Sequence, residues 1–144
     1  MKIKNQFESG YALLEVLIAA LVISFGLLGL AGLQATGLRN NHSAYLASVA
    51  TQLTYDMADR IRAYMGGMYS TASAVTHTGC LTGCTPQQIA EDDLLRWNQS
   101  VAEALPGGTT SQPILSNGLY TLTVTWNDTR TNSPTTSFQT TFQP

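Results

Sequence analysis

One uncharged stretch constrains this chain more than any other feature of its sequence. After Glu15 no charged residue occurs until Arg39, so the 23 residues from Val16 to Leu38 carry no charge. As an α-helix this stretch would be ~35 Å long. A bilayer core is ~30 Å thick and is crossed by about 20 apolar residues in a helix. The sequence therefore predicts a transmembrane helix near the N-terminus.

The charges that flank this stretch predict its orientation. Lys2 and Lys4 precede it, and basic residues favour the cytoplasmic side of a membrane. We therefore expect a single-pass protein of the inner membrane, with its N-terminus in the cytoplasm and its head in the periplasm. An ordinary secretory signal has an apolar region of only ~7–15 residues that ends at its cleavage site. An uncleaved signal anchor fits the length and stays open as an alternative.

Glu15 is the residue that a plain anchor does not explain. A carboxylate near the start of an apolar helix costs a few kcal/mol in lipid, so it is a functional hypothesis by default. The plainer alternative is that its side chain reaches the polar interface as the first polar residue of the helix.

The residues around Glu15 resemble the N-terminal motif of prepilins. Gly10-Tyr11-Ala-Leu-Leu-Glu15 places a glycine, an aromatic residue and a glutamate directly before the apolar stretch. Tyr11 stands where phenylalanine is commoner. The resemblance implies that residues 1–10 are a leader, that a prepilin peptidase cuts after Gly10, and that the freed amine of Tyr11 is methylated. Glu15 would then pair with this amine in its own or a neighbouring subunit.

Further segments resemble one subgroup, the PilV (type IV pilus modification protein) family of minor pilins. They are residues 27–34, residues 56–62 and the Asp93-x-x-x-Trp97 pattern, and the resemblance covers residues 1–65 well and the rest loosely. It implies a subunit that acts in pilus assembly initiation, at the tip or in adhesion, and that ends in a surface pilus. Its partners would be other minor and major pilins and the inner-membrane assembly machinery. The alternatives are a minor pseudopilin of a type II secretion system and an uncleaved, membrane-anchored binding module.

Helical periodicity continues beyond the uncharged stretch. We expect one helix from about Ala12 to Met65, because Gly66-Gly67 is a stop signal. Its membrane and assembly half would be residues 11–38 and its amphipathic half residues 39–65, which needs a further layer to cover its apolar face. The apolar residues that recur every three or four positions are Leu46, Val49, Leu53, Met57, Ile61 and Tyr64.

Residues 66–144 are predicted to form a small periplasmic head that begins with a polar loop. Cys80 and Cys84 lie in this loop, and a pair this close in an oxidising compartment favours a short-loop disulfide. A zinc site that also uses His77 is the alternative, but such sites take four ligands as a rule. We therefore expect a disulfide and no metal.

A second helix is predicted to start at Thr85. Thr85-Pro86-Gln-Gln88 has the pattern of a capping box with proline in the first turn. The acidic residues 91–93 suit the positive end of a helix, and we interpret them as solvated. The helix should end at residues 106–108, and its apolar face comprises Ile89, Leu94, Trp97, Val101 and Leu105.

The C-terminal part of the chain has the alternation of β-strands. Residues 119–126 place Tyr120, Leu122, Val124 and Trp126 on one face and threonines on the other. A second strand is expected over residues 136–142 and a short third near 113–115. The predicted fold class is therefore α+β and pilin-like, with a long N-terminal helix packed on a small antiparallel β-sheet.

Composition narrows the function further. The net charge of the chain is −2, whereas a protein that binds nucleic acid has an excess of basic residues. We therefore expect no nucleic-acid partner. His42 and His77 are the two histidines, and neither lies near a nucleophile pattern. The sequence has no phosphate-binding glycine loop and no pair of metal ligands at helical spacing. We therefore expect neither an enzyme nor a cofactor.

Overall fold

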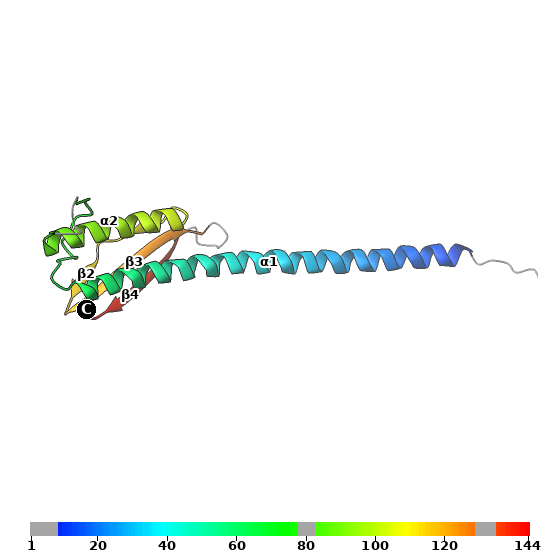
Figure 1. The fold of residues 1–144 in the computed structure, drawn as a ribbon. Coiled ribbons are helices and arrows are strands. Elements are labelled where there is room, and N and C mark those ends of the chain that lie inside the picture. Colours follow the sequence, from blue (N-terminus) through cyan, green and yellow to red (C-terminus); the bar gives the residue numbers. More distant parts are fainter. Residues whose placement is uncertain (1–8, 78–82, 129–134) are drawn as a thin grey trace, which may run out of the picture. The chain divides into compact units, whose positions relative to one another are not determined.

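The computed structural model of this chain describes residues 9–77, 83–128 and 135–144 (Figure 1). Helices and one antiparallel sheet give the α+β layout that the sequence predicts, with a long N-terminal helix. The elements are α1 (Ser9–Ala63), α2 (Pro86–Ala104), β1 (Thr109–Thr110), β2 (Ile114–Ser116), β3 (Leu119–Asn127) and β4 (Thr135–Phe142).

Helix α1 runs through 55 residues without interruption. The chain divides into two compact units, Met1–Asn41 and His42–Pro144, and α1 contributes to both. In the first unit every side chain of residues 11–41 is exposed. In the second unit α1 is partly buried and ends at Ala63, two residues before the predicted end. Arg60 and Arg62 lie in its last turn, where cations suit the negative end of the helix dipole.

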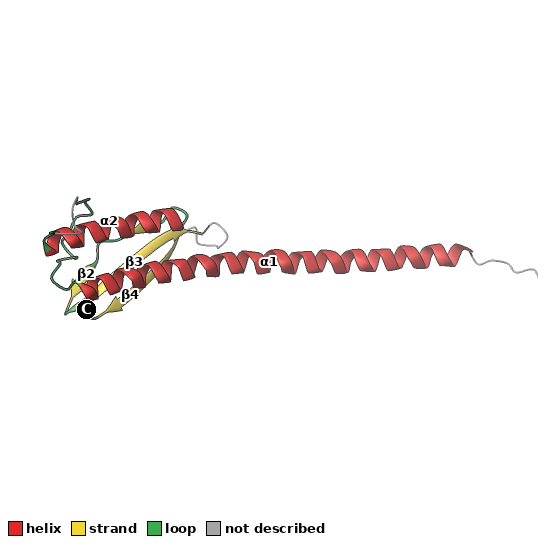
Figure 2. Cartoon of the chain, in the orientation of Figure 1, coloured by secondary structure: helices red, strands yellow, loops and turns green. Residues whose placement is uncertain are grey.

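The sheet is built around β3 (Figure 2). Strand β4 pairs with it along its whole length, from Tyr120 opposite Phe142 to Asn127 opposite Thr135. The other edge of β3 is shared by β2 near its start and by the two-residue strand β1 near its end. Of the four strands in the described residues, β1 is the one that sequence periodicity does not predict, because two residues are too few to show alternation.

A two-residue turn joins β2 to β3. Asn117 and Gly118 both have positive φ, 50° and 77°, as a type I′ turn requires, and Asn-Gly is its preferred sequence. The turn fixes the register of the hairpin with Ser116 opposite Leu119.

The core lies between the apolar face of the sheet and the two helices. Tyr120, Leu122, Val124 and Trp126 are buried, as their alternation predicts. On α1, Leu46, Met57 and Ile61 of the predicted stripe are buried, and Val49 and Leu53 pack against them half-buried. Tyr64 lies beyond the end of α1 and is exposed. Small residues complete the buried stripe, namely Ala50, Thr54 and Ala58.

Helix α2 begins with the predicted capping box. The Thr85 hydroxyl accepts from the Gln88 N–H at 3.3 Å, and Gln88 Oε1 accepts from the Thr85 N–H at 2.9 Å. Leu94, Trp97, Val101 and Leu105 of its predicted apolar face are buried, while Ile89 is half-buried. The chain then turns at Gly107, whose φ of 59° favours glycine.

Candidate functional site

The residues of the prepilin-like motif lie at the start of α1. Tyr11 and Glu15 are four residues apart in a helix, which places them on the same face one turn apart. Both side chains are exposed, Tyr11 at 78%. Gly10 lies within α1, whereas residues 1–8 of the predicted leader are outside the described residues. Cleavage, methylation and the pairing of Glu15 with an amine stay predictions.

The helix that carries this motif presents a continuous apolar surface. Leu17, Phe25 and Leu33 are 64%, 67% and 73% exposed, and all residues of the uncharged stretch are exposed. Among the described residues, this is the one helix long and apolar enough to cross a membrane. Such a surface needs lipid or other apolar helices to cover it.

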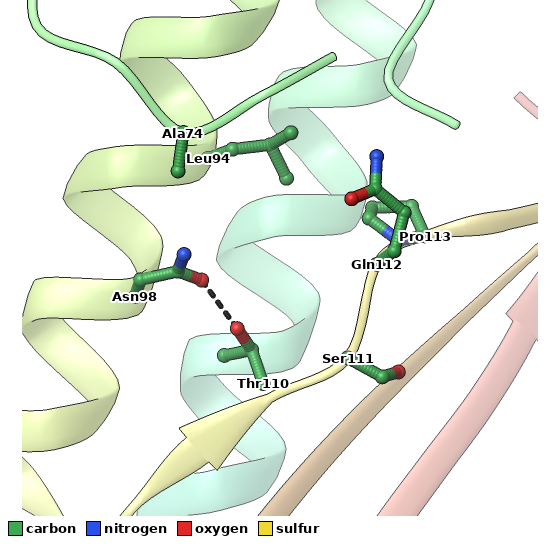
Figure 3. A pocket seen from close by; sticks show the side chains of 7 residues that line it. All are labelled: Ala74, Leu94, Asn98, Thr110, Ser111, Gln112 and Pro113. Atoms are coloured by element: carbon green, nitrogen blue, oxygen red, sulfur yellow. Dashed lines mark hydrogen bonds between the residues drawn. The ribbon is translucent and has the colours of Figure 1, made fainter. Parts of the chain in front are cut away.

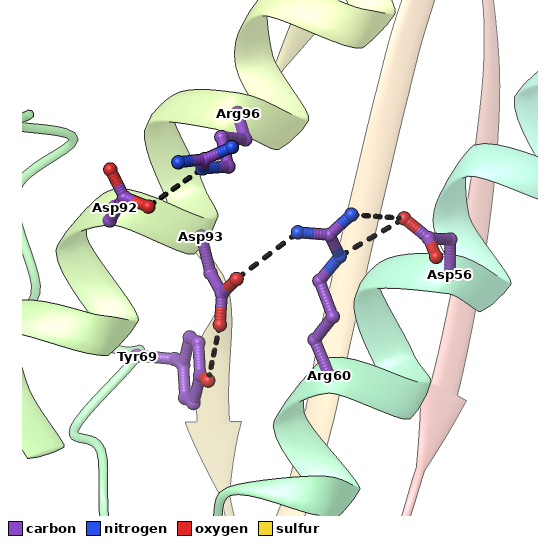
Figure 4. A network of polar contacts seen from close by, with 6 residues as sticks. All are labelled: Asp56, Arg60, Tyr69, Asp92, Asp93 and Arg96. Atoms are coloured by element: carbon purple, nitrogen blue, oxygen red, sulfur yellow. Dashed lines mark hydrogen bonds and ion pairs between the residues drawn. The ribbon is translucent and has the colours of Figure 1, made fainter. Parts of the chain in front are cut away.

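In the head, the acidic residues of α2 have specific partners, contrary to the interpretation that they are solvated. Asp93 accepts from the Tyr69 hydroxyl at 3.0 Å and from Arg60 of α1 at 3.1 Å (Figure 4). Asp92 is buried and accepts from Arg96 Nε at 2.7 Å. Asp93 therefore links α2 to α1 and to Tyr69, whereas the ion pair of Asp92 lies within α2.

The titration of this network follows from its geometry. Burial lowers the pKa of the Arg60 guanidinium, but the hydrogen bonds and charges of Asp93 and Asp56 outweigh it, so the pKa is raised. Burial, together with the negative charge of Asp93, raises the pKa of the Tyr69 hydroxyl. The hydroxyl therefore keeps its proton and remains a donor to Asp93.

The loop between the helices is anchored at two further points. His77 Nε2 lies 2.6 Å from Glu91 Oε2, with both side chains mostly buried. Gly67 packs against α2 so closely that an added Cβ would lie 2.9 Å from Ala90 Cβ.

Cys84 is not a free thiol. Cys80 lies outside the described residues, so the Cys80–Cys84 disulfide stays a prediction. The zinc alternative also depends on Cys80, while His77 is engaged by Glu91.

A polar pocket lies beside α2, and sequence patterns do not indicate it. Its volume is about 160 Å³, and Asn98 and Thr110 meet across it (Figure 3). Asn98 is a half-buried residue at the edge of the apolar face of α2, and the segment after β1 forms the facing wall. Only the tertiary structure brings these residues together.

Comparison with protein-family models, with curated proteins and with solved structures finds no match for this chain. The likeness to pilins therefore depends on the N-terminal motif and on the layout of helix and head.

Proposed function

We propose that this chain is a pilin-like minor subunit of a type IV pilus. A prepilin peptidase removes residues 1–10 and methylates Tyr11, and the exposed half of α1 holds the subunit in the inner membrane. The subunit then joins other pilins and contributes to assembly initiation, to the pilus tip or to adhesion.

The observation that carries this proposal is the difference in exposure between the first and the last part of α1. One uninterrupted helix has a first part in which every described side chain is exposed and a last part in which one apolar stripe, with Leu46, Met57 and Ile61, is buried in a small head. The exposed apolar part can pass from lipid to a bundle of like helices, because both surroundings cover apolar surface. The head keeps its own core in either state.

Glu15 can supply a polar contact when the exposed part of α1 passes from lipid into a bundle of helices. Cleavage after Gly10 would leave the Tyr11 ammonium at the positive end of the helix dipole, where a cation is unfavourable. An unpaired charge in apolar surroundings is costly, and the attraction between opposite charges is stronger there than in water. Glu15, one turn along, supplies the opposite charge to its own amine or to that of a neighbouring subunit.

The test is the incorporation of Glu15→Leu into fibres. We expect the wild-type chain in pili sheared from the cell surface, whereas Glu15→Leu is cleaved but stays in the membrane fraction. Glu103→Leu is the matched control, because it removes an exposed carboxylate of α2, and it should enter the fibres.

Normal incorporation of Glu15→Leu would contradict the role of its charge. A cleaved chain that is absent from surface pili but required for protein secretion would instead indicate a pseudopilin of a type II secretion system.

A further inference from the structure

Strand β4 has one edge without a partner strand among the described residues. On its other edge it pairs with β3 residue for residue, without a bulge. None of its residues is charged and none is a proline. Natural proteins protect unpaired strand edges with charges, prolines or bulges, because the free N–H and C=O groups of such an edge bind other strands. The open edge of β4 has none of these protections.

The backbone of β3 shows which groups of β4 lie on this edge. The Thr123 carbonyl accepts from the Ser111 N–H at 3.1 Å, and the Asn127 N–H donates to the Pro106 carbonyl at 2.8 Å. Thr123 and Asn127 therefore direct their backbone groups toward the segments that flank β1. Backbone groups alternate in direction along a strand, so the even-numbered residues of β3 direct theirs toward β4.

The register then divides β4 into two sets of residues. Val124 lies opposite Phe138 and Leu122 lies opposite Thr140, so Phe138 and Thr140 exchange their backbone hydrogen bonds with β3. The residues that alternate with them direct their N–H and C=O groups to the open edge. These residues are Ser137, Gln139 and Thr141. In the described part of the chain, no backbone hydrogen bond outside the helices and strands uses these groups.

The side chains along the edge define the class of partner. Ser137, Gln139 and Thr141 are exposed on the outer face of the sheet. Phe138 packs against the core on the other face but is only half-buried. An apolar side chain of an added strand can cover the rest of its ring, as cross-strand aromatic pairs do. A charged side chain would lose hydration there, because β4 offers no opposite charge.

A second copy of this chain fits the edge poorly. Antiparallel pairing of two β4 strands relates the copies by a two-fold axis perpendicular to the sheet, which reverses the direction of α1 in the second copy. Chains that enter one membrane with the same charge bias share one direction. Parallel pairing about a two-fold axis would turn the core faces to opposite sides, so that Phe138 would lie beside exposed polar side chains. The edge therefore suits a strand of a different chain.

We propose that the open edge of β4 binds an extended, uncharged strand of another protein chain by β-strand addition. Ser137, Gln139 and Thr141 exchange backbone hydrogen bonds with this strand. The apolar side chains of the added strand lie on the core side, next to Phe138, and its polar side chains continue the outer face. The site lies wholly within the head and does not depend on which fibre the chain joins.

The test measures amide exchange in the full chain, labelled with nitrogen-15, in zwitterionic micelles. In the free chain the amides of Phe138 and Thr140 should exchange slowly and that of Gln139 fast. The probe is a peptide with the sequence of β3, residues 119–127, because β3 has the required alternation, with two lysines added at each end for solubility. At saturation it should slow the exchange of Gln139 and its two edge neighbours at least about tenfold.

Three results would overturn the proposal. The first is an amide of Gln139 that already exchanges slowly in the dilute free chain, and the second is exchange that the peptide leaves unchanged. The third is equal slowing by a control peptide of the same composition whose order removes the alternation. Slowing that follows the concentration of the protein alone, without peptide, would instead assign the edge to a second copy and overturn the assignment to another chain.

The matched variants are Gln139→Pro and Gln139→Ala. Both remove the side chain, but only proline removes the N–H on the open edge, and proline is tolerated on edge strands when its nitrogen faces outward. Gln139→Pro should bind the peptide at least about tenfold more weakly than Gln139→Ala, since one donor is lost and its acceptor stays unpaired. Equal binding by the two variants would contradict the proposal. The wild-type measurements decide even if Gln139→Pro does not fold.

Discussion

Tyr69 connects several of the described parts of the head. Its side chain is fully buried, and its hydroxyl donates to Asp93 of α2, which also binds Arg60 of α1. Its carbonyl accepts from Gln112 of the segment after β1. Tyr69, in the loop between the helices, thus contacts α2 and the segment after β1, and Asp93 links it to α1.

Tyr69→Phe tests this connection, because it removes the hydroxyl and keeps the ring. We expect a loss of ~1 kcal/mol in the free energy of unfolding, the usual net value of one hydrogen bond, with an additional cost for the acceptor left behind. Urea unfolding followed by the fluorescence of buried Trp97 and Trp126 measures it. Tyr55→Phe, at an exposed position, is the control and should change stability little; equal effects of both variants would contradict the role of the Tyr69 hydroxyl.

Glu91 gives the head a defined response to acid. The hydrogen bond from His77, with a smaller contribution from Gln87, lowers the pKa of Glu91 below its ordinary value of 4.5. A carboxyl whose pKa is lower in the folded state stabilises the fold above its unfolded pKa, and this contribution is lost as the pH falls through the folded pKa. The wild type should therefore be more stable than Glu91→Gln near neutral pH.

The difference in unfolding free energy between these two proteins should shrink as the pH falls below 4.5. Urea unfolding at a series of pH values measures it, with Glu103→Gln as a control for removing a carboxylate from α2. A difference that stays constant from neutral to acidic pH would show that the contact with His77 does not stabilise the ionised form.

At the scale of elements, β3 shows how one alternating sequence supports two environments. Its apolar residues face the helices, while Thr121, Thr123 and Thr125 are half-buried on the other face. Thr121 and Thr141 face each other across β3 and β4, with hydroxyl oxygens 3.2 Å apart. One face of β3 thus packs in the core, and the other face is lined with threonine side chains.

Leu122→Ala and Thr123→Ala separate the two faces of β3. Leu122 is fully buried, so its truncation should cost ~2–5 kcal/mol, a value typical of a leucine side chain in a core. Thr123→Ala should cost well under half as much, because its side chain lies on the outer face. Thermal unfolding of both variants gives the comparison; similar losses would mean that the sheet does not cover the core through the face containing Leu122.

The elements that could be predicted from the sequence are those whose causes are local. The capping box at Thr85, the alternation of β3 and the uncharged stretch each depend on residues a few positions apart. The partners of Asp92 and Asp93 and the pocket at Asn98 could not be predicted in this way. They depend on α1, α2 and the segment after β1 coming together, and a helix with acidic residues near its start has the same sequence pattern whether those residues are solvated or paired.

At the scale of the whole molecule, the exposed apolar part of α1 requires surroundings that cover apolar surface. The head has its own core, whereas residues 11–41 bury none of their side chains within the first unit. Hydropathy predicts this property directly, because no charge interrupts the stretch after Glu15. Apolar burial is non-directional, so lipid tails and the apolar faces of other helices can both cover this surface.

The measurement that tests the proposed function most directly is the intact mass of the chain purified from cells with an active prepilin peptidase. The proposal predicts a protein that starts at Tyr11, lacks residues 1–10 and carries one additional methyl group on its amine. Fragmentation of the N-terminal peptide locates the methyl group. A protein that retains Met1 and the whole leader under these conditions would contradict the proposal and indicate an uncleaved membrane anchor.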